Sequence, residues 1–125
     1  STIPHGQKKA LPPIDKIRRV GGNVYLGCDG FFDSWSSYVS SDLLEKVNNF
    51  CQITGKITEV EISQTLNLAT RGLSTYNDSK APWIAVGDVA NILFTEVASS
   101  AELIARLPQK RTVLLNGHWI EPEYI

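Results

Sequence analysis

Residues 56–78, which read K-I-T-E-V-E-I-S-Q-T-L-N-L-A-T-R-G-L-S-T-Y-N-D, decide the fold expected for this chain. In the first half of the stretch, up to Leu66, apolar residues recur at the spacing of a short amphipathic helix. This helical phase breaks across residues 67–69 and resumes at Thr70. The stretch therefore predicts two short helices joined by a tight turn.

The beginning of the first helix and the turn carry local sequence signals. Thr58 can accept a backbone N–H as the N-cap, and Glu61 completes a Thr-x-x-Glu capping box. Ser63 supplies the small residue needed where two such helices cross. The turn needs a residue that tolerates positive φ, and Asn67 stands there. These residues predict where the first helix begins and where the chain turns.

Leu73 and Tyr76 would form the inward face of the second helix, although Gly72 within it costs about 1 kcal/mol of helix propensity relative to alanine. With these features, residues 58–78 resemble the helix-turn-helix motif of phage repressor and Cro-like DNA-binding proteins. The resemblance implies that the second helix enters the major groove of duplex DNA. The alternative is an ordinary helical hairpin that packs within the domain.

On the DNA interpretation, one set of side chains contacts base edges and another contacts phosphates. Arg71 is the residue best suited to a bidentate guanine contact. The basic residues near the motif and in the N-terminal arm would position the protein on the backbone. The expected DNA-binding residues are Thr70, Arg71, Ser74, Thr75, Lys56, Lys80, Lys8 and Lys9.

The flanking segments predict a mixed fold. A helix is expected over residues 42–51, capped by Ser40 or Ser41 and ended by Gly55. Two β-prone runs within residues 17–26 predict an N-terminal hairpin, and the Asn-Gly pair at 116–117 predicts a C-terminal one. The fold class expected is α+β, a helical core with a central helix-turn-helix-like pair flanked by an N-terminal and a C-terminal β-hairpin.

Residues 88–107 predict further helix, either one bent helix or two. Asp88 would cap the first part, and Ser99 with Glu102 forms a second capping pattern that Pro108 ends. The apolar side of this segment is wider than a small surface helix needs. It predicts either a homodimer interface, as used by proteins that read paired half-sites, or additional core.

Composition limits the class of protein. The chain has 125 residues, of which 42% are hydrophobic and 20% charged, which predicts a single globular domain over 14–125 after a flexible basic arm at 1–13. No apolar run reaches membrane-spanning length, no signal peptide is visible, and the two cysteines, without a zinc-site spacing, predict free thiols in the cytoplasm. No catalytic, cofactor or metal-ligand motif is present, so the sequence predicts no cofactor or metal site and points away from an enzyme, with a catalytic site assembled from scattered residues left open.

Two functions remain open on the sequence alone. The first is a DNA-binding regulatory or accessory protein, and the second is a small protein-binding inhibitor or adaptor without catalytic activity. The net charge of −1 favours the second, because a monomeric DNA-binding domain usually has a larger basic excess. A basic stripe across Arg71 and Lys56 would support DNA, whereas an apolar patch would support a protein partner. The aromatic residues expected to dock a partner are drawn from Phe31, Phe32, Trp35, Trp83 and Trp119.

Overall fold

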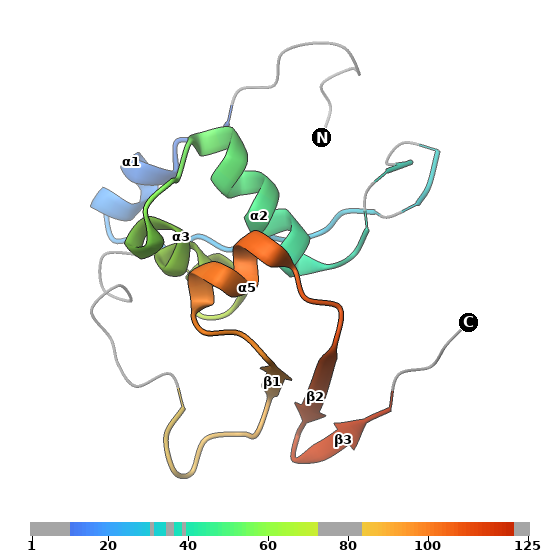
Figure 1. The fold of residues 1–125 in the computed structure, drawn as a ribbon. Coiled ribbons are helices and arrows are strands. Elements are labelled where there is room, and N and C mark those ends of the chain that lie inside the picture. Colours follow the sequence, from blue (N-terminus) through green and yellow to red (C-terminus); the bar gives the residue numbers. More distant parts are fainter. Residues whose placement is uncertain (1–10, 31, 35–36, 39, 73–83, 122–125) are drawn as a thin grey trace.

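The computed structural model describes residues 11–30, 32–34, 37–38, 40–72 and 84–121. Their elements are α1 (Ile14–Arg19), α2 (Leu43–Thr54), α3 (Glu59–Thr65), the 3₁₀ turn η1 (Leu66–Ala69), β1 (Ile92–Thr95), α5 (Ser100–Arg106), β2 (Arg111–Leu115) and β3 (His118–Ile120). The helices gather into one body, and the strands form a small sheet that extends from it beyond α5 (Figure 1). The α+β class expected from the sequence is confirmed.

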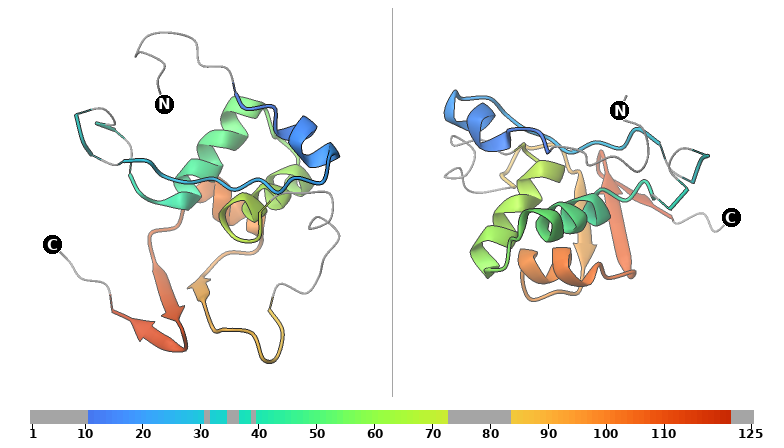
Figure 2. Two further views of the ribbon diagram at one scale, coloured as in Figure 1. Left: turned by 180° about the vertical axis from the view of Figure 1, so that it is seen from behind. Right: turned by 90° about the horizontal axis from the view of Figure 1, so that it is seen from above.

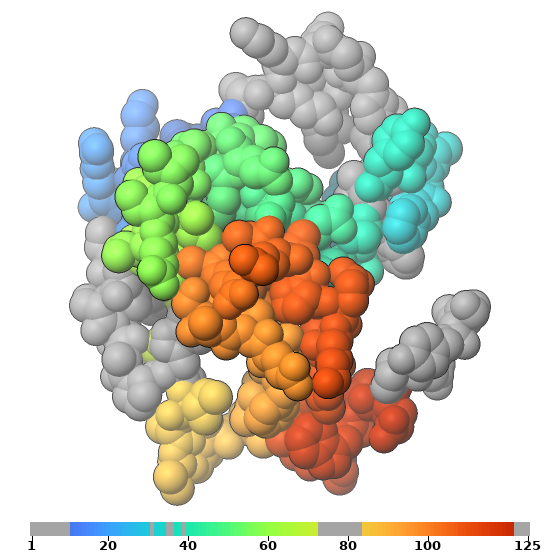
Figure 3. Space-filling model, in the orientation of Figure 1, coloured from blue at the N-terminus to red at the C-terminus, as the bar shows by residue number. Residues whose placement is uncertain are grey.

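The hydrophobic core lies between the helices. Leu68, Ile104 and Val47 are its largest fully buried side chains, contributed by η1, α5 and α2. Figure 2 shows α2, α3 and α5 side by side from two further directions, and Figure 3 shows their atoms in contact across the front of the molecule. The buried cluster consists of Leu44, Val47, Cys51, Leu66, Leu68, Leu103 and Ile104.

Helix α2 is capped by Asp42 at its N-terminus and by Gly55 at its C-terminus. Its N-cap is Asp42, whose carboxylate accepts the backbone N–H of Leu44, so the expectation of a Ser40 or Ser41 cap is wrong. Ser40 instead accepts the backbone N–H of Asp42 and donates to Glu45. Gly55 ends the helix at φ 68°, as expected, because glycine adopts this left-handed conformation without a steric penalty.

The capping box predicted for α3 is confirmed. The Thr58 hydroxyl accepts the backbone N–H of Glu61 at 3.3 Å, and the Glu61 carboxylate accepts the backbone N–H of Thr58 at 3.2 Å. The Thr58 hydroxyl also donates to that carboxylate at 2.8 Å. This side-chain hydrogen bond is the main cause of a lowered pKa for Glu61, with the backbone N–H groups of Thr58 and Ile57 adding to it.

After η1, residues 70–72 form a turn at the position where the second helix was expected to begin. The Asn67 carbonyl accepts the N–H groups of Thr70, Arg71 and Gly72, and Gly72 has φ +77°. Asn67 itself is buried within η1 and does not have positive φ, so that prediction is wrong. Thr70 and Arg71 lie in a turn, and the remainder of the expected second helix falls at 73–76, outside the described residues.

The N-terminal hairpin expected within residues 17–26 is absent. Residues up to Arg19 belong to α1, which follows two prolines and carries an ion pair of 3.9 Å between Asp15 and Arg18. Downstream, the backbone N–H of Leu26 donates to the carbonyl of Leu68 at 2.9 Å. Val24 and Leu26 pack against the helical core, so tertiary packing overrides the local β propensity of this segment.

The three strands form an antiparallel sheet in the order β1-β2-β3. The C-terminal hairpin lies where the Asn-Gly pair predicted it, with Asn116 at φ 51° and Gly117 at φ 80° between β2 and β3. The helix expected to begin at Asp88 is wrong, because residues 92–95 instead pair with residues 111–114 as β1. The second half of that segment is helical, and α5 begins at its predicted N-cap, Ser99.

Candidate protein-docking surface

The residues expected to bind DNA are divided between different parts of the molecule. Lys56 lines a hollow of about 420 Å³ between α1, α2 and α3. Thr70 and Arg71 line a separate hollow of about 540 Å³ between the helices and the sheet. The Arg71 carbonyl accepts hydrogen bonds from the side chains of Asn23 at 3.2 Å and Tyr25 at 3.0 Å. Ser74, Thr75, Lys80, Lys8 and Lys9 lie outside the described residues.

The sheet presents apolar side chains on both of its faces. In the register of the strands, Ile92 lies opposite Leu114, and Leu114 lies opposite Trp119. Because side chains alternate along a strand, these three share a face with two further residues, and the neighbouring positions point the other way. We call the first face the aromatic face: Ile92, Phe94, Thr112, Leu114 and Trp119. The second is the aliphatic face: Leu93, Thr95, Arg111, Val113, Leu115, His118 and Ile120.

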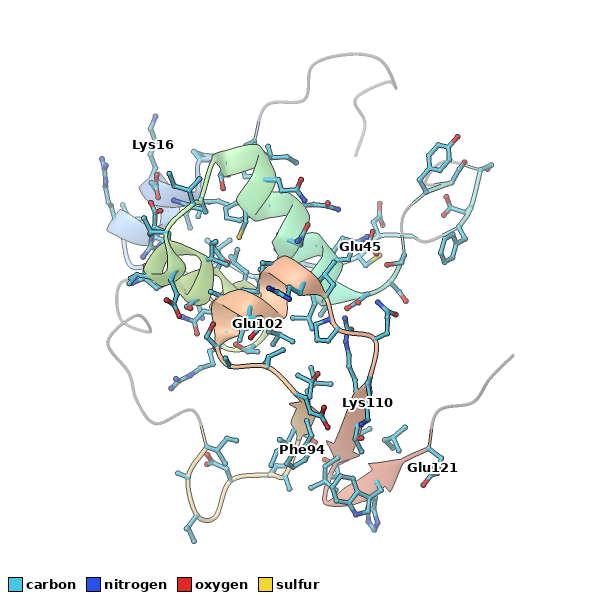
Figure 4. All side chains as sticks on the ribbon, viewed as in Figure 1. Lys16, Glu45, Phe94, Glu102, Lys110 and Glu121 are labelled. Carbon is cyan, nitrogen blue, oxygen red and sulfur yellow. The ribbon has the colours of Figure 1, made fainter. Side chains whose placement is uncertain are left out.

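The aromatic face holds an exposed pair of rings. The ring centroids of Phe94 and Trp119 are 5.6 Å apart with planes inclined by 48°, a tilted contact typical of stabilising aromatic pairs. Phe94 is 45% exposed and Trp119 is 60% exposed. Figure 4 places Phe94 among the strands, apart from Lys16 on α1. The pair is therefore formed but left largely open to solvent.

The aliphatic face is tied to the helices at one end. The guanidinium of Arg111 donates from Nη1 to the Asp42 carboxylate at 2.8 Å and from Nε to the Pro108 carbonyl at 2.6 Å. Beside the hairpin turn Leu115 is 48% exposed, and Ile120, which lies opposite Val113, is 46% exposed. The sheet thus has an anchored end and an open end.

No strand residue belongs to the hydrophobic core cluster, and none of the partly buried hydrophobic residues packed against that cluster lies on β1, β2 or β3. The large apolar side chains that remain exposed on the strands are Leu93, Phe94, Val113, Leu115, Trp119 and Ile120. Each is roughly half exposed, so complete burial would contribute about 1 kcal/mol per side chain and about 6 kcal/mol in total. These six side chains make the sheet a candidate surface for contact with another polypeptide, although Tyr38 and Val86 elsewhere in the described chain are more exposed.

Only part of this surface was predictable from the sequence. Trp119 was among the aromatic residues expected to dock a partner, and Phe32 is also exposed, while Phe31, Trp35 and Trp83 lie outside the described residues. Phe94 was missed because its segment was assigned to a helix. A signal was available in the run Ile-Leu-Phe-Thr at 92–95, which has the β-branched and aromatic content of a strand.

A metal site or a membrane-spanning helix would also indicate a function. Within the described part of the chain, no group of three or more His, Cys, Asp or Glu residues is arranged to hold a metal ion. None of the helices in these ranges is long and apolar enough to cross a membrane.

Comparison with known proteins relates the chain to part of a longer protein. No protein-family model matches the chain, and no solved structure matches it. The Escherichia coli protein YahJ, described as uncharacterized, is 29% identical over 121 residues, which is 96% of this chain. The matched segment is 26% of YahJ, so the chain spans about a quarter of the length of this relative. The similarity thus concerns one segment of a much larger polypeptide.

Proposed function

We propose that this chain is a protein-docking module that binds a larger polypeptide through its three-stranded sheet. The observation that carries the proposal is a sheet with apolar side chains on both faces and no residue in the hydrophobic core. Among the two functions left open by the sequence, an apolar patch was the feature that would favour a protein partner.

The pattern of the sheet supports this choice. Sheets with one solvated face alternate apolar and polar residues, whereas strands covered on both sides read as continuous apolar runs. Here Val113, Leu114 and Leu115 are consecutive in β2, and Ile92, Leu93 and Phe94 are consecutive in β1. The six large apolar side chains exposed on the strands keep between 36% and 60% of their surface accessible. The sheet is therefore suited to lie between two further layers of protein.

The similarity to YahJ suggests what kind of partner meets this surface. In YahJ the matched segment is joined to a polypeptide about three times its own size. We take the corresponding three-quarters of YahJ as the test partner. A second copy of this chain is a weaker candidate, because a two-fold contact through one face of the sheet leaves the opposite face uncovered.

The proposal is tested with YahJ from which the matched quarter has been removed. We expect a one-to-one complex with this chain by light scattering and isothermal titration. Trp119→Ser should weaken binding about tenfold or more, because exposed aromatic anchors dominate interface energies. Ile53→Ser, at a 67% exposed position on α2, is the matched control and should bind like the parent chain.

Three results would overturn the proposal. The first is absence of a complex between this chain and the truncated YahJ at tens of micromolar. A control mixes the matched quarter of YahJ with the truncated YahJ, and the absence of a complex with this chain counts against the proposal whatever that control gives. The second is equal weakening by Trp119→Ser and Ile53→Ser. The third is self-association of the chain alone that Trp119→Ser abolishes, since the sheet would then serve the homodimer expected from residues 88–107. Tight, salt-dependent binding to a randomised DNA duplex, lost in Arg71→Ala, would instead favour the DNA function.

A further inference from the structure

We infer that Asn116 is a site of spontaneous deamidation, and that hydrogen bonds from the β2–β3 turn to residues 90 and 91 hold it latent in the folded chain. The inference does not depend on the proposed docking function. It rests on the Asn-Gly sequence of the turn, on the exposure of both residues and on the hydrogen bonds that their backbone makes.

The residue pair in the turn is chemically labile. In deamidation the backbone nitrogen of Gly117 loses its proton and attacks the side-chain carbonyl carbon of Asn116. A C–N bond forms and ammonia leaves, which gives a five-membered succinimide that water opens to aspartate or isoaspartate. Glycine favours this attack because it has no side chain to hinder the nitrogen and the widest backbone freedom. Asn116 is the only asparagine of the chain that is followed by glycine.

The side chain of Asn116 is available for the reaction. Both turn residues are exposed to solvent, so water can reach the succinimide. The Asn116 carboxamide makes no hydrogen bond within the described part of the chain. Rotation of this group toward the Gly117 nitrogen is therefore not opposed by a side-chain hydrogen bond.

The backbone of the folded turn withholds the attacking nitrogen. The Gly117 N–H donates to the Ala90 carbonyl at 3.1 Å, and the Asn116 N–H donates to the Asn91 side-chain oxygen at 2.8 Å. Ring closure must break the first bond, because the Gly117 nitrogen gives up its hydrogen. The second bond restrains the backbone on the other side of the Asn116 Cα atom. Each bond thus adds to the free energy needed to reach the reactive geometry.

The acceptors of these bonds are placed by the sheet. Residues 90 and 91 directly precede β1, whose Ile92 pairs with Leu114 of β2. The two acceptors consequently reach the turn only when β1 is paired, and they are lost from it when the chain unfolds. Folding of the sheet therefore decides whether Asn116 reacts.

The modification would alter the hairpin. Isoaspartate carries the main chain through the side-chain carbon, which lengthens a turn whose residues have φ of 51° and 80°. Turn length sets the register of a hairpin, so the pairing of Trp119 with Leu114 would be displaced. The contact between the Phe94 and Trp119 rings depends on that register.

The test measures conversion of Asn116 by peptide mapping with mass spectrometry, in mildly alkaline buffer at one temperature. The chain unfolded in urea should deamidate there roughly tenfold or more faster than the folded chain, because both hydrogen bonds are absent. Asn91→Ala removes one acceptor and should speed the reaction of the folded chain about threefold to tenfold. The same variant should speed hydrogen exchange of the Gly117 amide, and in urea it should deamidate like the parent.

Two control variants separate the hydrogen bonds at the turn from overall stability. Asn91→Asp keeps a side-chain oxygen that can accept the Asn116 N–H, so it should deamidate at the rate of the parent chain. Asn48→Ala removes a different asparagine bond, from its Nδ2 to the Ile104 carbonyl at 2.9 Å between α2 and α5, and should also leave the rate at Asn116 unchanged. Circular dichroism establishes that each variant is folded under the conditions of the assay.

The inference is overturned by any of three results. Absence of deamidation at Asn116 in urea would show that the site is not labile. Equal rates in the folded and unfolded parent chain would show that the turn does not protect it. An unchanged rate in folded Asn91→Ala, or equal acceleration by Asn91→Ala and Asn48→Ala, would show that residues 90 and 91 are not the cause of the protection.

Discussion

A pair of leucine-to-alanine substitutions compares the packed core of this protein with the sheet that is proposed to dock a partner. Leu68 in η1 is fully buried, with 0% of its surface exposed, whereas Leu115 in β2 is 48% exposed. The substitution removes the same atoms at both positions. Any difference in the free energy of unfolding therefore reports how much protein surrounds each side chain.

The expected magnitudes follow from these exposures. Leu68→Ala should cost about 3–4 kcal/mol, because a core leucine loses both its transfer free energy and the contacts of the cavity left behind. Leu115→Ala should cost less than about 1 kcal/mol, since half of the side chain is already in water and no cavity forms. The loss expected for Leu68→Ala corresponds to a fall in melting temperature of roughly 10–15 °C for a chain of this size.

Urea unfolding followed by far-ultraviolet circular dichroism measures both values on the isolated chain. The slope with denaturant must remain unchanged for the comparison to hold. Equal losses at Leu68 and Leu115 would refute the reasoning, because the sheet would then already be covered in the isolated chain. A loss below about 1 kcal/mol at Leu68 would show that the helices do not form the main core. Leu115→Ala should weaken docking even though it leaves stability nearly intact.

Three further outcomes are expected. The fold lowers the pKa of Glu61, so its carboxylate stabilises the fold at pH values above the ordinary pKa of 4.5, and this stabilisation is lost as the pH falls through the lower pKa of the folded state. Urea titrations from pH 7 to pH 3 should therefore show a steeper loss of unfolding free energy for the parent chain than for Glu61→Gln. Both cysteines are free, and Cys28 is exposed while Cys51 is buried, so a thiol reagent should modify the first at once and the second only in denaturant. Gly72→Ala should cost more than Gly55→Ala in thermal melts, because both glycines have positive φ but only the first lacks room for a methyl group.

Some local signals in the sequence predicted the ends of elements correctly, whereas those at Ser40, Ser41, Asn67 and Asp88 did not. The Thr58 capping box and the Asn-Gly turn at 116–117 each act within a few residues, so no information about distant parts of the chain was needed. Gly55 belongs to the same class, as its positive φ is a property of one residue. These positions fixed where helices begin or end and where the chain reverses direction.

Pairing partners and tertiary packing were not predictable in the same way. The apolar positions from Val89 to Val97 fit a helical spacing, yet residues 92–95 gain a partner strand almost twenty positions later in the chain. The segment leading to Leu26 packs on η1 through a hydrogen bond to Leu68, a contact that no local pattern encodes. At Thr70, three N–H groups converge on the Asn67 carbonyl and hold residues 70–72 in a turn, an arrangement that no local pattern predicted.

The same division between local and long-range forces bears on how the sheet can bind. β2 and β3 are joined by the two-residue turn at 116–117, and the Phe94–Trp119 contact joins β1 to β3 across β2. Arg111 fixes the sheet to Asp42 of the helical body at one end. The strands are therefore already paired in the isolated chain, which on the proposed docking function would lower the conformational entropy lost on association. A sheet that is ordered but not buried is what a docking surface requires, and its apolar side chains would then contribute mainly to affinity and little to the stability of the free chain.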